Sequence, residues 1–307
     1  MINELDINYY SYLIEMELEH RKFRERLFAS TSLNMLRESN NAEFVEPVYE
    51  GVLKSIFDFI ANIFQKVIDF FKNILNFLTG KKGNNTDYSF TVDQDLLTRC
   101  EQKMKDFSLE DRKTFKLEKI DAYEILKTNV PSIETLLKNH RNVLDDTMNK
   151  FEKLSKADVG LELFKHDTLE TIEKDSKKID ELRNIDNIED SFKDITFNEI
   201  SKVMSNYKSG EKIIADLKVE VENSIKDMEG YKKKVEKSNL EKRAITENSE
   251  KVIKDVKNYI LAATSLITKG SKAKMDLNLI AFGSQGKILR KFVAFKSEKE
   301  DKQGGDK

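Results

Sequence analysis

The most regular hydrophobic pattern in the chain covers residues 52–79, where Phe, Ile, Leu and Val surround a narrow row of polar side chains. The polar positions follow one another at intervals of three or four residues: Lys54, Asp58, Asn62, Gln65, Asp69, Lys72 and Asn76. This spacing predicts one amphipathic helix with a single polar stripe. Such a helix is not stable alone in water, so it must lie against the protein's own bundle, another component of an assembly, or a membrane.

We expect the large apolar side chains of this segment to form its contact surface. They are Ile56, Phe57, Phe59, Ile60, Ile63, Phe64, Phe70, Phe71, Ile74 and Phe77. Charged residues spread along the segment argue against a conventional transmembrane span, because each costs about 2.5–3.5 kcal/mol near a bilayer centre. Insertion into or onto a membrane remains the alternative to burial against protein.

Helical periodicity continues through most of the chain. It predicts one or two helices over residues 3–38 and further helices over 93–107, 165–184, 187–206, 209–238 and 240–268, with another helix beginning at Pro131. Asp93 and Ser108 are expected N-caps. The fold class predicted from this pattern is all-α: an antiparallel helical bundle preceded by the long Phe-rich amphipathic helix.

Breaks in the pattern divide the chain into five segments. They are an acidic N-terminal segment 1–50, the Phe-rich helix 51–80, a linker 81–92, a helical bundle 93–270, and a basic amphipathic segment with a disordered tail 271–307. The first connector, residues 39–51, contains Pro47 and several polar residues, which predicts an exposed, protease-accessible stretch.

Composition agrees with an all-α fold. Charged residues make up 35% of the chain, whereas it has only 2 Pro and 11 Gly, which is typical of long solvated helices. Cys100 is the single cysteine, so an intramolecular disulfide is excluded. The N-terminus has no basic region followed by an apolar one, so we expect synthesis in the cytoplasm without a secretory signal.

Charge is unevenly distributed along the chain. Residues 1–50 carry ten acidic and five basic residues, and residues 251–307 carry six acidic and thirteen basic residues. Removal of the first fifty residues would therefore change the net charge from −2 to a positive value. A basic remainder is compatible with a position near nucleic acid.

The sequence around Glu50 resembles a maturation site of tailed bacteriophages of the T-even type. Their prohead protease cleaves after an apolar-x-Glu tripeptide and before Gly, Ala or Ser. Val48-Tyr49-Glu50 before Gly51 is similar to that pattern, and Leu36-Arg37-Glu38 before Ser39 is a second match. An acidic leader, a cleavage site and then an amphipathic helix resemble internal head or scaffold-associated virion proteins.

This resemblance implies a non-enzymatic virion structural protein. It would be made in the host cytoplasm, processed after Glu50 or Glu38, and incorporated into the particle through the Phe-rich helix. Its partners would be other virion proteins or further copies of itself, and packaged DNA in contact with Lys287, Arg290, Lys291 and Lys296. The alternative function is a membrane-active or pore-forming protein that inserts residues 52–79.

No catalytic pattern is evident in the sequence. The three histidines lie far apart, and His140 falls on an apolar helical face, where a buried structural histidine is the usual outcome. Neighbouring carboxylates carry little information in a chain with 55 acidic residues. We therefore expect no enzymatic activity, no metal, no cofactor and no small-molecule substrate.

Overall fold

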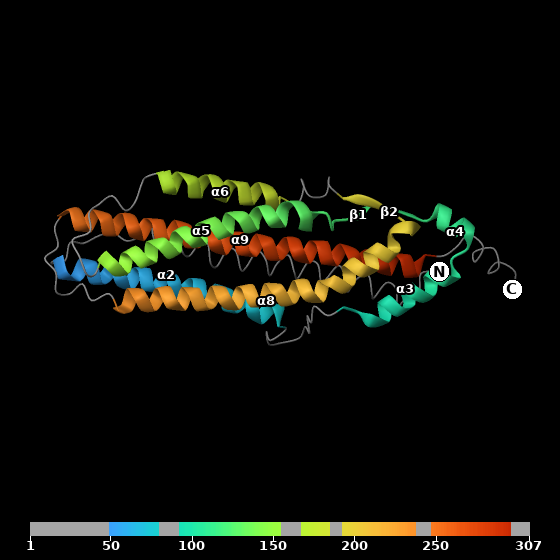
Figure 1. Cartoon of the computed structure of the whole chain (residues 1–307), viewed down its shortest axis with the longest axis horizontal. Coiled ribbons are helices and arrows are strands. Elements are labelled where there is room, and N and C mark those ends of the chain that lie inside the picture. Colours follow the sequence, from blue (N-terminus) through green and yellow to red (C-terminus); the bar gives the residue numbers. More distant parts are fainter. Residues whose placement is uncertain (1–48, 80–91, 155–166, 185–191, 238–246, 296–307) are drawn as a thin grey trace, which may run out of the picture.

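The computed structural model describes residues 49–79, 92–154, 167–184, 192–237 and 247–295. These residues form an elongated, almost entirely helical bundle (Figure 1), so the predicted all-α class is confirmed. The N-terminal segment before residue 49, the linker 80–91 and the C-terminal tail from 296 lie outside the described residues.

Five long helices run along the bundle: α2 (Tyr49–Leu78), α5 (Ile125–Leu154), α6 (Asp167–Arg183), α8 (Ile200–Lys237) and α9 (Glu247–Ala294). Contacts between their ends define their directions. Lys274 of α9 contacts Glu134 of α5 and Glu220 of α8, whereas the later α5 residue Leu137 lies near the earlier α9 residue Gly270. Likewise, Gly210, earlier in α8, lies near Phe282, later in α9. The helices α5 and α8 are therefore antiparallel to α9.

Shorter elements close the end of the bundle at which α8 begins and α9 ends (Figure 1). They are α3 (Gln94–Asp106), α4 (Leu109–Thr114), β1 (Lys116–Asp121), β2 (Lys193–Thr196) and the 3₁₀ turn η2 (Phe197–Glu199). Asp93 caps α3, since its side chain accepts a hydrogen bond from the backbone N–H of Leu96. Ser108 and Asp111 form a capping box on α4. Both predicted N-caps are confirmed.

The strands β1 and β2 pair antiparallel in a small sheet that the helical patterning does not predict. Their register shifts between Leu117 and Asp121, and Lys119 within this irregular stretch has a φ of 41°. The N–H of Lys119 donates to the carboxylate of Asp194 at 2.9 Å, and Lys116 forms an ion pair with the same carboxylate at 2.8 Å. These side-chain contacts stabilise the bulge where ladder bonds are missing.

Apolar side chains gather in two cores. The larger core extends along the bundle between α2, α5, α6, α8 and α9. The smaller core lies beneath α3, α4 and the sheet, where Phe107, Phe115, Phe197 and Phe292 pack ring against ring at centroid distances of 5.1–6.1 Å. Both α8 and α9 contribute to each core, so these two helices join the end of the molecule to its shaft.

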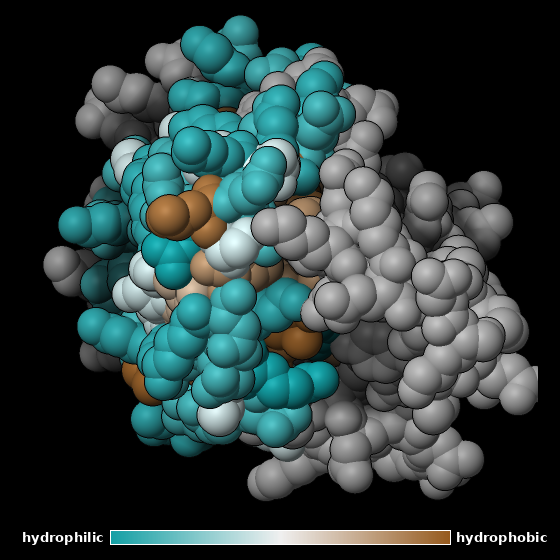
Figure 2. Space-filling view, turned by 90° about the vertical axis from the view of Figure 1, so that its right-hand side faces the viewer, coloured by the Kyte–Doolittle hydropathy of each residue, from teal (hydrophilic) through white to brown (hydrophobic). Residues whose placement is uncertain are grey.

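The surface at this end is largely hydrophilic. Figure 2 shows polar side chains around small, separate apolar areas on the described part of this face. Leu109 of α4, at the same end, is 77% exposed. Isolated apolar side chains of this kind are normal on a protein surface.

Several predicted boundaries are wrong. Residues 193–199 form β2 and η2 rather than part of a helix over 187–206, because Ile195 and Phe197 turn alternately into the smaller core. Pro131 lies inside α5, which already begins at Ile125, and its ring is exposed. A proline early in a helix removes little hydrogen bonding, because the first N–H groups have no intrahelical partner.

The predicted separation of residues 93–270 from 271–307 also differs from the structure. Helix α9 continues through Gly270 to Ala294 without a break. At Gly270 a methyl group would lie 2.7 Å from Leu137 of α5 and 3.2 Å from Ile179 of α6. The glycine permits three helices to approach closely, whereas the sequence pattern reads it as a helix end.

A second close approach fixes where α8 crosses α9. Gly210 of α8 lies under the ring of Phe282 of α9, and a Cβ at Gly210 would be 1.9 Å from that ring. Phe282 stacks on Tyr207 with a centroid distance of 5.0 Å and an interplanar angle of 4°. The small residue is therefore required for the aromatic pair that bridges the two helices.

We expect Gly210→Ala to lower the free energy of unfolding by about 1–3 kcal/mol, as overpacking does in a well-packed core. Gly230→Ala on the same helix is the matched control, because no atom lies within 4 Å of the added methyl group. That change should stabilise the protein by about 0.5–1 kcal/mol through helix propensity. Thermal unfolding followed by circular dichroism measures both, and equal effects would contradict this account of the crossing.

Candidate functional site

The apolar surface of the Phe-rich helix faces the interior of the same molecule. Of the ten predicted contact residues, eight are buried: Phe57, Ile60, Ile63, Phe64, Phe70, Phe71, Ile74 and Phe77. Phe59 is half-buried beneath the ammonium group of Lys257, which lies 5.0 Å from its ring centroid. The side chain of Ile56 lies outside the described part of the structure.

The opposite side of α2 has the predicted polar stripe. Asp58, Asn62, Asp69, Lys72 and Asn76 are all exposed. Gln65, at the edge of the stripe, donates to Asp69 at 2.9 Å and accepts a hydrogen bond from Lys232 of α8 at 2.9 Å. The stripe therefore faces water while the rest of the helix packs on α8 and α9.

Contact with the protein's own bundle is thus the arrangement that the structure adopts for α2. In this arrangement its buried phenylalanines are not available to another protein or to lipid. Among the described residues, no helix is long and apolar enough to cross a membrane.

The predicted cleavage residues lie at or before the start of α2. Glu50 and Gly51 belong to its first turn, so the helix begins three residues earlier than the exposed connector 39–51 implies. Glu38 and Ser39 lie outside the described residues.

The predicted basic residues lie on the last turns of α9. Lys287 and Lys291 are exposed, Arg290 is partly buried, and Lys296 is outside the described residues. Positions 287, 290 and 291 share one face of a helix. Cations near a helix C-terminus also interact favourably with the helix dipole.

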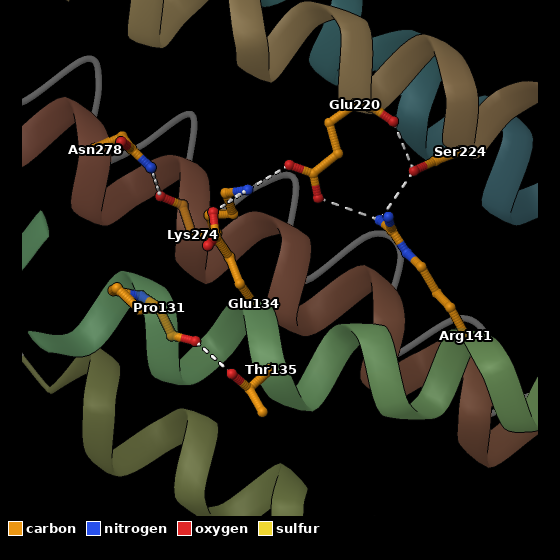
Figure 3. A network of polar contacts seen from close by, with 8 residues as sticks. All are labelled: Pro131, Glu134, Thr135, Arg141, Glu220, Ser224, Lys274 and Asn278. Atoms are coloured by element: carbon orange, nitrogen blue, oxygen red, sulfur yellow. Dashed lines mark hydrogen bonds and ion pairs between the residues drawn. The ribbon is translucent and has the colours of Figure 1, made fainter. Parts of the chain in front are cut away.

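The structure brings together a polar network that the sequence analysis does not predict. Figure 3 shows it between α5, α8 and α9. Lys274 of α9 contacts Glu134 of α5 at 2.7 Å and Glu220 of α8 at 2.5 Å. Arg141 of α5 then contacts Glu220 at 3.4 Å and the hydroxyl of Ser224 at 3.0 Å. One chain of charges therefore joins three helices.

Burial and charge act in opposite directions on Lys274. Burial alone would lower the pKa of its ammonium group, but the hydrogen bonds and charges of Glu134 and Glu220 outweigh that effect and raise the pKa above its ordinary value. The ammonium group is therefore held in its charged form. A lysine with a side chain only 13% exposed and two carboxylate partners is a structural ion pair.

Other polar contacts fasten α6 to the same body. His140 of α5, which is buried, has its Nε2 2.8 Å from a carboxylate oxygen of Asp175. Lys269 of α9 contacts Asp180 of α6 at 2.5 Å, and Arg183 of α6 lies 3.2 Å from buried Asp276 of α9. These contacts agree with the expected structural role of His140.

Tyrosine and cysteine side chains in the cores are held in their protonated forms. Burial raises the pKa of Tyr259 and of the Cys100 thiol to about 12. Burial and a hydrogen bond to Asp145 raise the pKa of Tyr231 well above its ordinary value. Cys100 is fully buried, with its Sγ 3.7 Å from the carbonyl oxygen of Leu289. A thiol in this environment is not a competent nucleophile.

The ion pairs of this network align α5, α8 and α9 with one another. Its charges pair with one another, and each pair joins two different helices. Among the described residues, no group of three or more His, Cys, Asp or Glu side chains is arranged to hold a metal ion. Partly buried charge pairs of this kind favour one alignment of the helices, because a shifted alignment leaves a charge without its partner.

The sequence contains a signal for this network. Residues 268–278 of α9 carry five buried polar side chains: Thr268, Ser271, Lys272, Asp276 and Asn278. The loss of apolar periodicity there appears in the sequence as a boundary at Gly270. These polar residues can be recognised as buried only when the positions of the neighbouring helices are known.

We expect Lys274→Met to lower the free energy of unfolding by about 1–3 kcal/mol, because Glu134 loses its cation and Glu220 retains only Arg141. Lys226→Met on the exposed face of α8 is the matched control and should change stability by less than about 0.5 kcal/mol. Urea unfolding of both variants measures the difference. A Lys274→Met protein as stable as the control would contradict the structural role.

Stability should fall as pH rises from about 10 to about 12. In the unfolded chain tyrosine releases its proton near pH 10, whereas folded Tyr259 holds its proton to about pH 12. The unfolded state therefore binds fewer protons over this interval, and stability decreases by about 1.4 kcal/mol per pH unit for each full proton of difference. Tyr259→Phe and Tyr231→Phe should each flatten this decrease. Urea unfolding at several alkaline pH values measures the slope, and an unchanged slope would contradict the assignment.

Comparison with known proteins identifies no relative for this arrangement. No family model, no curated protein and no solved structure matches the chain.

Proposed function

We propose that this chain is a non-enzymatic structural protein of a tailed phage particle, an internal head or scaffold-associated component that loses residues 1–50 by cleavage after Glu50. The resemblance of Val48-Tyr49-Glu50-Gly51 to a prohead protease site supports this proposal. The helical body supports it as well, since its partly buried ion pairs join helices to one another.

The observation that carries the proposal is the position of Glu50 relative to the packed body. The bond between Glu50 and Gly51 lies in the first turn of α2. Phe57, the first side chain of α2 that the structure describes as buried, lies almost two turns further along. Cleavage would therefore remove the acidic leader and leave every described buried residue of the two cores in place.

The first turn of a helix is also a place where a protease can bind the chain in extended form. The first N–H groups of a helix have no intrahelical acceptor, and helix ends fray. Gly51 weakens this turn further, because glycine costs about 1 kcal/mol relative to alanine within a helix. The local cost of exposing this bond is therefore small.

The proposed cleavage site and the basic residues lie at opposite ends of the molecule. Helix α2 begins at one end, and the last turns of α9 with Lys287 and Lys291 form part of the other (Figure 1). In the proposed function the basic end faces packaged DNA, with which these exposed cations interact through phosphate groups.

Intact mass measurement of the protein from purified particles tests the proposal. We expect a chain beginning at Gly51. A Glu50→Ala variant assembled into particles should retain residues 1–50, because the residue before the cleaved bond is changed. A protein that still begins at Met1 in mature wild-type particles would contradict the maturation.

Glu38→Ala provides the matched control for that experiment. It alters the second protease-like match while leaving the one at Glu50 intact. We expect this variant to be processed at Gly51 like the wild type. A wild-type mature chain that begins at Ser39, together with loss of this processing in Glu38→Ala, would instead assign the cleavage to the second site.

A further inference from the structure

Helix α2 differs from the other long helices in the kind of contact that holds it. Every buried side chain of α2 that the structure describes is apolar. The buried surfaces of α5, α8 and α9 include polar side chains, such as His140, Ser224 and Asp276. The described part of the chain thus places polar side chains in the interior of the body, and only apolar ones in the interior face of α2.

Directional bonds fix the alignment of the body helices. The network around Lys274 joins α5, α8 and α9, and His140 with Asp175 joins α5 to α6. Tyr231 of α8 donates to Asp145 of α5, and Lys234 of α8 donates to Asn149 of α5 at 2.7 Å. A helix of this body cannot leave without separating buried charges from their partners, which is costly.

The contacts of α2 with this body are mostly non-directional. Its phenylalanines and isoleucines pack in the groove formed by apolar side chains of α8 and α9, whereas Lys232 and Lys257 reach α2 from the edges of the groove. Apolar contacts are proportional to buried area and do not depend on a particular donor and acceptor. An identical α2 from another copy would restore these apolar contacts together with those of Lys232 and Lys257.

The chain path permits such an exchange. Residues 80–91 join α2 to α3, and the proposed cleavage after Glu50 would make α2 the first element of the mature chain. A segment of that length spans about 40 Å when fully extended. Exchange of a terminal element between identical chains is a low-cost route to oligomers, since it uses the contacts of the closed monomer.

We propose that the α8–α9 groove accepts α2 from a second copy of this chain, so that copies associate by exchanging the Phe-rich helix. The proposal deepens the assembly role proposed above and rests on it for its biological purpose. A second copy fits better than lipid, because the exposed stripe of α2 carries Asp58 and Asp69 as well as lysines. Membrane-surface helices are usually rich in Lys and Arg on this face.

A zero-length cross-linking experiment with the full chain tests the exchange. One copy, labelled with ¹⁵N, carries Gln65→Glu and Lys232→Ala. The other, unlabelled, carries Gln65→Ala and keeps Lys232. In the native contact the side chains of residues 65 and 232 are 2.9 Å apart. The first copy lacks Lys232 and the second lacks a carboxylate at position 65, so this contact can be cross-linked only when α2 of the first copy lies in the groove of the second. After co-incubation, a carbodiimide joins the introduced carboxylate to the amine as an amide.

Asn149 and Lys234 provide the matched control pair within the body. Their side chains are 2.7 Å apart and join α5 to α8. One labelled copy carries Asn149→Asp and Lys234→Ala, and the unlabelled copy carries Asn149→Ala. A single chain with Gln65→Glu alone confirms that the groove geometry supports cross-linking at monomer mass.

We expect heavy–light dimers at twice the 35.7 kDa chain mass, linked between positions 65 and 232, and none linked between positions 149 and 234. Mass spectrometry of the linked peptides identifies each pair. Absence of the 65–232 dimer, while the single chain cross-links internally, would overturn the proposal. Dimers linked at both pairs would overturn it too, because exchange would then not be confined to α2. The mass of the particle-derived chain tests cleavage separately, so either proposal can fail alone.

Discussion

Coverage of the apolar face of α2 is the constraint on which the rest of the architecture depends. A 30-residue helix with aromatic and aliphatic side chains over most of its surface loses a large hydrophobic free energy if that surface is left in water. The structure meets this requirement within one molecule, by placing α2 in the groove between α8 and α9. These two helices are the longest in the described chain, and they extend beyond α2 to carry the second core at the other end.

Two kinds of interaction hold the interior together: burial of apolar side chains and ion pairs between helices. Hydrophobic burial supplies most of the favourable free energy, but it does not by itself select one alignment of the helices. Ion pairs such as Lys274 with Glu220 and Arg183 with Asp276 add little net stability, because the loss of hydration offsets their attraction. Each pair can form, however, in only one alignment of its two helices. The body therefore has a fixed alignment, whereas α2 is attached by contacts that another copy can provide. This difference is the physical basis for the proposed exchange of α2 between copies.

The two ends of the molecule have different chemical characters, which fits the proposed role. At one end α2 begins next to the Glu50–Gly51 bond, where a leader can be removed without disturbing either core. At the other end, Phe107 and Phe115, which flank α4, pack with Phe197 of η2 and Phe292 of α9 in the core beneath the small sheet. The close packing of Gly210 against Phe282 makes the junction of the two parts dependent on one small residue.

The sequence by itself determined the helical class, the polar stripe of α2 and the caps at Asp93 and Ser108, because these features depend on residues a few positions apart. Only the tertiary structure decided that the Phe-rich face is covered by the chain's own α8 and α9, that α9 passes through Gly270, and that residues 193–196 form a strand. It also brought together Glu134, Glu220 and Lys274, which are far apart along the chain. Such outcomes depend on which surfaces meet in space. Hydrophobic periodicity shows that a helix face must be buried, but it does not show which other helix buries it.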